Sequence, residues 1–193
     1  MADDERPDLD PVDDTIALEL EFLTSLIWAP DSVTVIAVHA LVGTAIERAL
    51  GPDQVARADV LPLDTTLFIR RDHALVFAAV VARVDGALPV TPTLLAESLS
   101  DPKARASVRN VLLEIGAPTG QGPLPGGADV PHLAIAVVDH WYRRGYIALV
   151  SKMALACEES PTDDLADRWA DLTAHQQRAH RRRSEVRRRL AQV

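Results

Sequence analysis

Residues 131–157 read PHLAIAVVDHWYRRGYIALVSKMALAC, and after the turn EESP residues 162–190 read TDDLADRWADLTAHQQRAHRRRSEVRRRL. The spacing of apolar residues in the first segment is helical rather than strand-like. In the second segment a seam that alternates steps of four and three predicts a heptad-type helix with polar interruptions at Gln176 and Arg183. The expected seam consists of Leu165, Trp169, Leu172, Gln176, Ala179, Arg183, Val186 and Leu190.

The short connection between these two segments favours an antiparallel helical hairpin. Ser160 is expected to cap the second helix, with Pro161 at its first position. A hairpin of this kind uses one face for its partner helix and leaves another apolar, so we expect pairing with a second copy of the chain. The predicted dimer or partner interface comprises Trp141, Tyr142, Trp169, Leu165 and Leu172, although aromatic residues at helical spacing are as often core residues.

The composition bounds the class of protein. With 48% hydrophobic and 4% aromatic residues, and alanine and leucine in excess, an all-α domain is expected. The single cysteine, Cys157, excludes an intramolecular disulfide, indicates a reducing compartment, and is expected to be a small core residue. We find neither a secretory signal nor an apolar run long enough for a bilayer, which predicts a cytoplasmic protein without a membrane partner.

Charge is unevenly distributed along the chain. Seven arginines and one acid between residues 178 and 189 give this stretch six net positive charges, so the rest carries fourteen negative charges against a total of −8. One interpretation is a solvated helix face whose positive charge is compensated by acids elsewhere in the chain, for example those of the first fourteen residues. The other is a nucleic-acid contact through phosphates, made by Arg178, Arg181, Arg182, Arg183, Arg187, Arg188 and Arg189.

The distribution of glycine, proline and charged residues divides the sequence into four regions. Residues 1–12 are acidic and expected to be disordered, residues 13–116 form a helical head, residues 117–130 a Gly/Pro hinge and residues 131–190 the hairpin. Within the head we expect a helix from Asp13 or Asp14 to Ala29, and a second from Val33 to Leu50 capped by Asp31 or Ser32. The β-branched start of the second helix also permits a strand. A short helix near residues 54–58 and an extended segment at 61–63 follow.

The most informative local sequence runs from Leu67 to Leu99. It predicts an aromatic anchor, a helix that carries His73 and Phe77, a stop at Gly86, an extended link, and a helix capped near Thr91. This order resembles the N-terminal domain of DnaB-type replicative helicases. The residues that carry the resemblance are Phe68, His73, Phe77, Pro89, Val90, Leu95, Glu97 and Leu99.

The resemblance implies a head and hairpin that assemble as dimers, or as three dimers, and contact a replicative helicase or primase. It implies a non-enzymatic interaction module, because the chain lacks the Gly-x-x-x-x-Gly-Lys loop that binds phosphates. We therefore expect no catalytic residue, cofactor or metal ion. Two alternatives stay open: a dimeric DNA-binding protein that uses the arginine-rich helix, and a fragment of a complete helicase.

Overall fold

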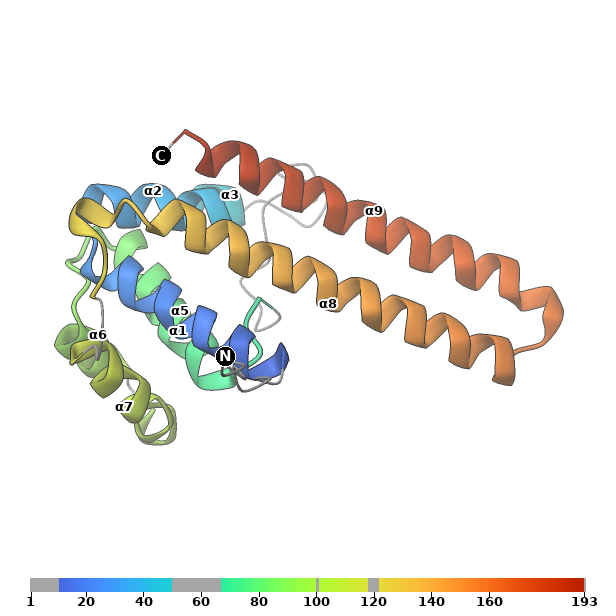
Figure 1. Ribbon diagram of the computed structural model, residues 1–193, viewed down its shortest axis with the longest axis horizontal. Helices are drawn as coiled ribbons and strands as arrows, with labels where there is room; N and C mark the ends of the chain where they lie inside the picture. Colours follow the sequence, from blue (N-terminus) through green and yellow to red (C-terminus); the bar gives the residue numbers. More distant parts are fainter. Residues whose placement is uncertain (1–10, 50–66, 100, 118–121, 193) are drawn as a thin grey trace, which may run out of the picture.

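The computed structural model describes residues 11–49, 67–99, 101–117 and 122–192. Within these ranges the regular structure is helical throughout, which confirms the predicted all-α class. The helices α1 to α7 form the head, while α8 and α9 run side by side along it and beyond it (Figure 1). Sequence predictions for residues 1–10, 54–58 and 61–63 lie outside the described residues.

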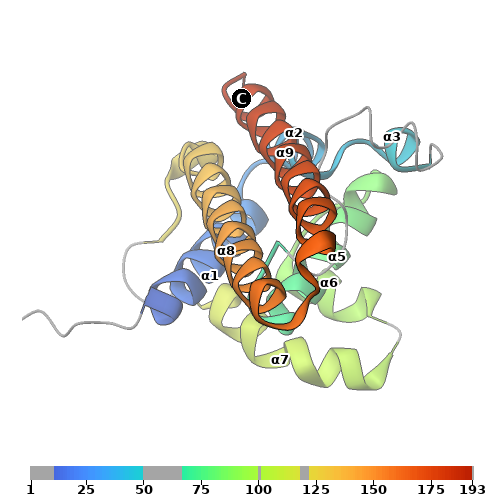
Figure 2. The ribbon, with the colours of Figure 1, turned by 90° about the vertical axis from the view of Figure 1, so that its right-hand side faces the viewer.

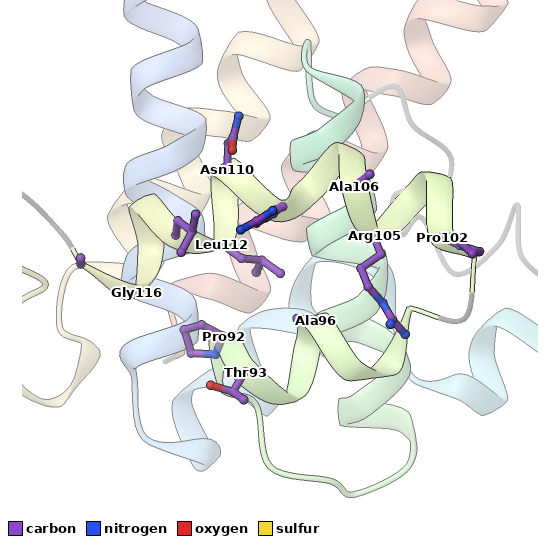
Figure 3. A pocket seen from close by; sticks show the side chains of 12 residues that line it. Pro92, Thr93, Ala96, Pro102, Arg105, Ala106, Asn110, Leu112 and Gly116 are labelled. Carbon is purple, nitrogen blue, oxygen red and sulfur yellow. The ribbon is translucent and has the colours of Figure 1, made fainter.

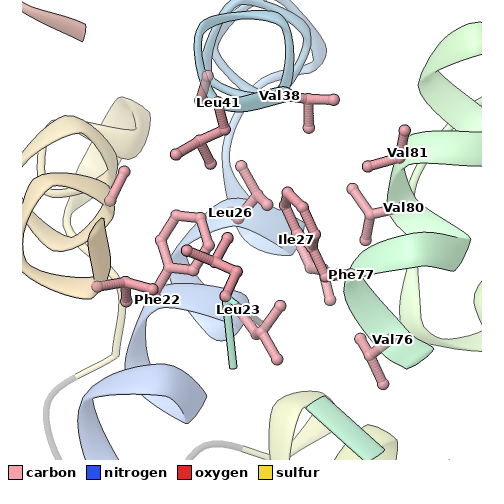
Figure 4. Packing of buried hydrophobic residues seen from close by; sticks show 14 of the residues in the cluster. Phe22, Leu23, Leu26, Ile27, Val38, Leu41, Val76, Phe77, Val80 and Val81 are labelled. Atoms are coloured by element: carbon pink, nitrogen blue, oxygen red, sulfur yellow. The ribbon is translucent and has the colours of Figure 1, made fainter. Parts of the chain in front are cut away.

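The core of the head is built around α1 (Pro11–Trp28). Phe22, Leu23 and Leu26 are completely buried, and side chains of α2 and α5 close over them (Figure 4). The rings of Phe22, Phe68 and Phe77 form a triangle, with centroids 5.3 to 6.4 Å apart. Such spacings are typical of aromatic side chains that stabilise a core beyond the burial of their area.

The second helix does not run as the sequence predicted. Helix α2 (Asp31–Val42) begins after Pro30, without a side-chain cap from Asp31 or Ser32, and ends at Gly43. Gly43 has φ of 74°, in the left-handed region that favours glycine. Helix α3 (Ala45–Ala49) starts again with a capping box, in which the Thr44 N–H donates to Glu47 Oε2 (2.7 Å) and the Glu47 N–H donates to Thr44 Oγ1 (3.2 Å).

The stretch Asp31–Ala49, which spans α2 and α3, is long and apolar enough to cross a membrane by length and composition alone. It is the one such stretch among the described residues, and the sequence reasoning overlooked it. The core helix of a soluble protein passes the same test. In the structure Ala37, Val38 and Leu41 of α2 are buried in the core of the head.

A buried ionisable pair joins α1 to the start of α5 (Arg71–Asp85). His73 Nδ1 lies 2.9 Å from Glu19 Oε2, and both side chains are 1% exposed. The other carboxylate oxygen of Glu19 accepts a hydrogen bond of 2.5 Å from the Ile69 N–H. The carboxylate of Glu19 on α1 therefore holds the backbone at the start of α5. Glu19 was not identified from the sequence.

Helices α6 (Pro92–Ser98) and α7 (Pro102–Gly116) form the lower side of the head in Figure 1. Thr91 caps α6 as predicted, and Asp101 caps α7 by accepting from the N–H groups of Lys103 and Ala104. The turn after α5 places Ala87, rather than Gly86, in the left-handed region, with φ of 51°. The indole of Trp28 donates to the Ile115 carbonyl (2.8 Å) and fixes the end of α7 to α1.

The described part of the predicted hinge, residues 122–129, contacts α1 and includes the turn η1 (Pro125–Gly127). The Ser25 hydroxyl donates to Asp129 (2.5 Å). A Cβ on Gly127 would lie 2.7 Å from the Cβ of Ala29, and its φ of 71° also favours glycine. These contacts hold the described residues against the head, whereas hinge motion stays a prediction.

Helix α8 (Val130–Glu159) and helix α9 (Leu165–Leu190) contribute to the core at the ends nearest the head. The buried residues there are Val130, Ala134, Val137, Val138, Val186 and Leu190. The predicted cap is wrong, since Ser160 closes α8 through its N–H to the Ala156 carbonyl (2.9 Å). The turn η2 (Thr162–Asp164) then precedes α9, which has no side-chain cap.

We expect Glu19→Ala to lower the free energy of unfolding by about 3 kcal/mol, because it leaves His73 and the Ile69 N–H buried without their partner. Urea unfolding followed by circular dichroism measures this loss. Glu21→Ala is the matched control two residues away, where the side chain is exposed and a change within about 0.5 kcal/mol is expected. Equal losses in the two variants would contradict the assigned role of Glu19.

Candidate interaction surfaces

The hairpin projects beyond the head after Arg144, which contacts the Leu67 carbonyl, and we call residues 145–159 of α8 and 165–177 of α9 the distal hairpin. It projects to the right of the head in Figure 1, and Figure 2 shows the same helix pair from its free end. Within this region only Ala156 and Gln176 are buried. Two helices alone therefore cover little of their own apolar surface.

Large apolar side chains are exposed along the distal hairpin. Ile147 is 62% exposed, Val150 56% and Trp169 53%, and Tyr146 and Leu155 are similar. Ile147 and Val150 line a shallow hollow of about 590 Å³ beside Tyr142, and Trp169 lines a second of about 430 Å³. Contiguous exposed apolar surface on a soluble domain is typical of an interaction site.

The five residues of the predicted interface do not share one environment. Trp169 is exposed, whereas Leu165 and Leu172 are half-buried in the seam between α8 and α9. Trp141 is half-buried and packs against the core of the head. Tyr142 is also half-buried and contacts the ring of Tyr146 and the guanidinium of Arg183, which lies 5.1 Å from its centroid. Of the five, Trp169 is the one whose side chain is mostly accessible to a partner.

At least four of the seven arginines between residues 178 and 189 contact acids. Arg183 and Arg187 both donate to Asp139 on α8, at 2.7 and 2.6 Å. Arg188 and Arg189 contact Glu185 within α9, and Arg189 also reaches Glu47 on α3 (3.3 Å). Arg178 and Arg181 are exposed and Arg182 is half-buried. The acids that compensate the charge of these arginines lie on α8, α3 and α9 itself. This combination was not predicted from the sequence.

The arginines lower the pKa of the acids they contact. Burial raises the pKa of Asp139, but hydrogen bonds from Arg183 and Arg187 outweigh this and lower it overall. The hydrogen bond from Arg188, together with Arg189, lowers the pKa of Glu185 from 4.5 to about 2. The backbone hydrogen bond from Thr44 lowers the pKa of Glu47. These carboxylates are ionised at neutral pH and compensate part of the charge of α9.

The residues that carry the resemblance to replicative helicases lie in the head. Phe68, His73, Phe77, Val90 and Leu95 are buried and Leu99 is half-buried, whereas Pro89 and Glu97 are exposed. Most of the eight residues therefore pack inside the head, and none of them lies in the distal hairpin. Cys157, expected in the core, is exposed near the hairpin turn.

Comparison of the chain with models of protein families, with curated proteins and with solved structures finds no match. The resemblance and the functions it implies therefore stay predictions.

The contacts between arginines and carboxylates predict that the protein loses stability as the pH is lowered. A carboxylate whose pKa is lower in the folded state stabilises the fold above its unfolded pKa, and this contribution is lost as pH falls through the folded pKa. For Glu185 the loss falls between pH 4.5 and about 2. We expect Glu185→Gln to cost about 1 kcal/mol at pH 7, because its partners are partly solvated, and progressively less over this window.

Urea unfolding at a series of pH values measures this dependence. Glu158→Gln is the control, since Glu158 is an exposed acid at the end of α8. The assignment fails if the difference between Glu185→Gln and the parent protein is independent of pH.

Proposed function

We propose that this chain is a non-enzymatic interaction module that pairs with a second copy through its distal hairpin and acts at a replicative helicase or primase. The single observation that carries the proposal is the exposed apolar surface of the distal hairpin. Exposure of Ile147, Val150 and Trp169 to water is unfavourable, and a partner that covers them would remove this cost.

The size of the distal hairpin suits such an interface. A stable protein interface buries about 800 Å² and roughly 20–30 residues on each partner. The distal hairpin offers a comparable number of residues on two straight helices, which a second copy can meet by a two-fold operation. A large aromatic residue such as Trp169 is a typical energetic centre of such an interface.

The choice of partner rests on the resemblance. In DnaB-type helicases the corresponding domain forms a collar that contacts primase and loader proteins, and a free-standing copy would act there as an adaptor or competitor. Further support is the placement of the motif residues inside the head, which leaves the outer surfaces of head and hairpin available to partners.

The arginine-rich helix supports a second candidate, direct DNA binding, more weakly. Phosphate contacts need cations that are free to release counterions. At least four of the seven arginines between residues 178 and 189 instead contact Asp139, Glu185 or Glu47. This pattern favours the interpretation in which the charge of α9 is answered within the protein.

We expect Ile147→Glu combined with Val150→Glu to convert a dimer into a monomer, because association would bury two carboxylates without partners. Sedimentation velocity should show a dimer dissociation constant raised at least about 30-fold, a change of about 2 kcal/mol. Ile46→Glu, at an apolar side chain 78% exposed on α3, is the matched control and should leave association unchanged. A parent protein that is monomeric at all concentrations would contradict the pairing.

We further expect saturable binding to the replicative helicase or primase of the same host, in roughly the micromolar range, measured by biolayer interferometry near physiological salt. Duplex DNA is the comparison ligand and should show little dependence on salt. The absence of binding to both proteins by a folded dimer would overturn the helicase proposal. Steeply salt-dependent DNA binding, lost on replacing Arg178, Arg181 and Arg182 by alanine, would favour the second candidate.

A further inference from the structure

A second surface lies on the opposite side of the head from α9, as both whole-chain views show (Figures 1 and 2). It is a groove of about 960 Å³ between α6 and α7. Its apolar lining includes Ala96, Ala106, Leu112 and Leu113, and Leu113 is 61% exposed. Figure 3 shows α6 and α7 lying alongside each other, with Pro92 and Gly116 at one end of the groove and Pro102 at the other. This surface was not predicted from the sequence.

The edge of this groove is cationic. Arg105 crosses from α7 to the end of α6, where its guanidinium donates to the Leu99 carbonyl (2.8 Å) and remains exposed to solvent. Arg109 lies one turn further along α7, and Lys103 precedes both. No acidic partner is assigned to these three side chains within the part of the chain that the structure describes.

This situation contrasts with that of α9. There Arg183, Arg187 and Arg189 contact acids of the same protein, in a chain whose net charge is −8. The charged residues that line the groove are Arg105 and Arg109, both cations, whereas Glu97, Asp101 and Glu114 of the same two helices and their caps are not among the lining residues. Such a surface is complementary to a ligand that has one apolar face and one acidic face.

We propose that the groove between α6 and α7 binds an acidic amphipathic helix of a partner protein. The fifteen residues of α7 span about 22 Å at 1.5 Å per residue, which matches four turns of a bound helix. Apolar side chains of that helix, at i, i+3/i+4 and i+7, fill the space over Leu112 and Leu113. Its carboxylates meet Arg105 and Arg109. This proposal goes beyond the function proposed above and does not rest on pairing through the hairpin.

A concave site favours a helix over a membrane surface. A helix that binds lipid presents a convex apolar face to the bilayer. Here the apolar residues of α6 and α7 line a hollow between two helices, and the cations stand at its edge (Figure 3).

The test uses the full chain and a designed, fluorescently labelled peptide of about 18 residues, with a leucine stripe and glutamates on the opposite face, in fluorescence anisotropy at about 0.1 M salt. Arg109→Glu and Leu113→Asp should each weaken binding at least about 10-fold. A peptide with lysines in place of the glutamates should bind Arg105→Glu/Arg109→Glu better than the parent protein. Arg71→Glu, the matched reversal of one exposed cation outside the groove and outside the distal hairpin, should bind the acidic peptide as the parent does.

Three results would overturn the proposal. The first is equal binding of the acidic peptide by the parent and by the groove variants, or no binding by either. The second is binding to phosphatidylserine-containing vesicles, lost in the same variants, without peptide binding, which would assign the groove to lipid. The third is a change in oligomeric state on Leu113→Asp, which would assign it to a second copy of the chain. Circular dichroism confirms that each variant is folded, and Arg109→Glu leaves the Arg105 contact with α6 intact.

Discussion

The carboxylate of Glu19 is the interaction on which the head depends. It sits on the buried face of α1, where an isolated charge would be costly, and it is tolerated because His73 and the Ile69 N–H both contact it. The Arg144 guanidinium lies near enough for the charge of Glu19 to raise its pKa, although burial lowers that pKa more. Arg144 also donates to the Leu67 carbonyl (2.7 Å). One polar cluster therefore joins α1, the entry to α5 and the middle of α8.

This cluster also determines where the hairpin leaves the head. Before Arg144, α8 carries Val130, Ala134 and Val138 into the core, and after it the buried residues almost cease. The far end of α9 returns to the head and places Val186 and Leu190 against the same core. The hairpin is thus held to the head at one end by packing, by Arg144 on the Leu67 carbonyl and by Arg189 on Glu47. The ion pairs of Asp139 with Arg183 and Arg187 join its two helices to each other.

Sequence patterns predicted the helices well because helical periodicity is a local signal. Phe68, Phe77 and Leu95, which carry the resemblance, are buried in the core. Two other features, the buried Glu19 and the capping box of α3, also have local sequence signals, but these were not recognised. Glu19 is four residues before Leu23 and seven before Leu26, on the same face of α1, and Gly43 is followed by the Thr-x-x-Glu order of a capping box.

The contacts between distant elements could not be predicted in this way. Asp139 and Arg183 are 44 residues apart, and the spacing of residues in either helix does not indicate which acid will answer which arginine. For the same reason the groove between α6 and α7 left no signal, since it exists only once two short helices pack on α5 and α1. Sequence reasoning gave weight to the densest run of charge, in α9.

Density of charge is a poor guide to a binding surface, because a run of arginines attracts acids of its own protein when it folds against them. On α9 the contacts with Asp139, Glu185 and Glu47 lower the pKa of each acid and reduce the charge available to a ligand. On α7 two cations, Arg105 and Arg109, are the charged residues that line the groove, while the acids of α6 and α7 are not among its lining residues. What a partner meets is the charge left exposed after folding. In this protein that charge includes Arg105 and Arg109 beside an apolar groove as well as the exposed Arg178 and Arg181 of the arginine-rich helix.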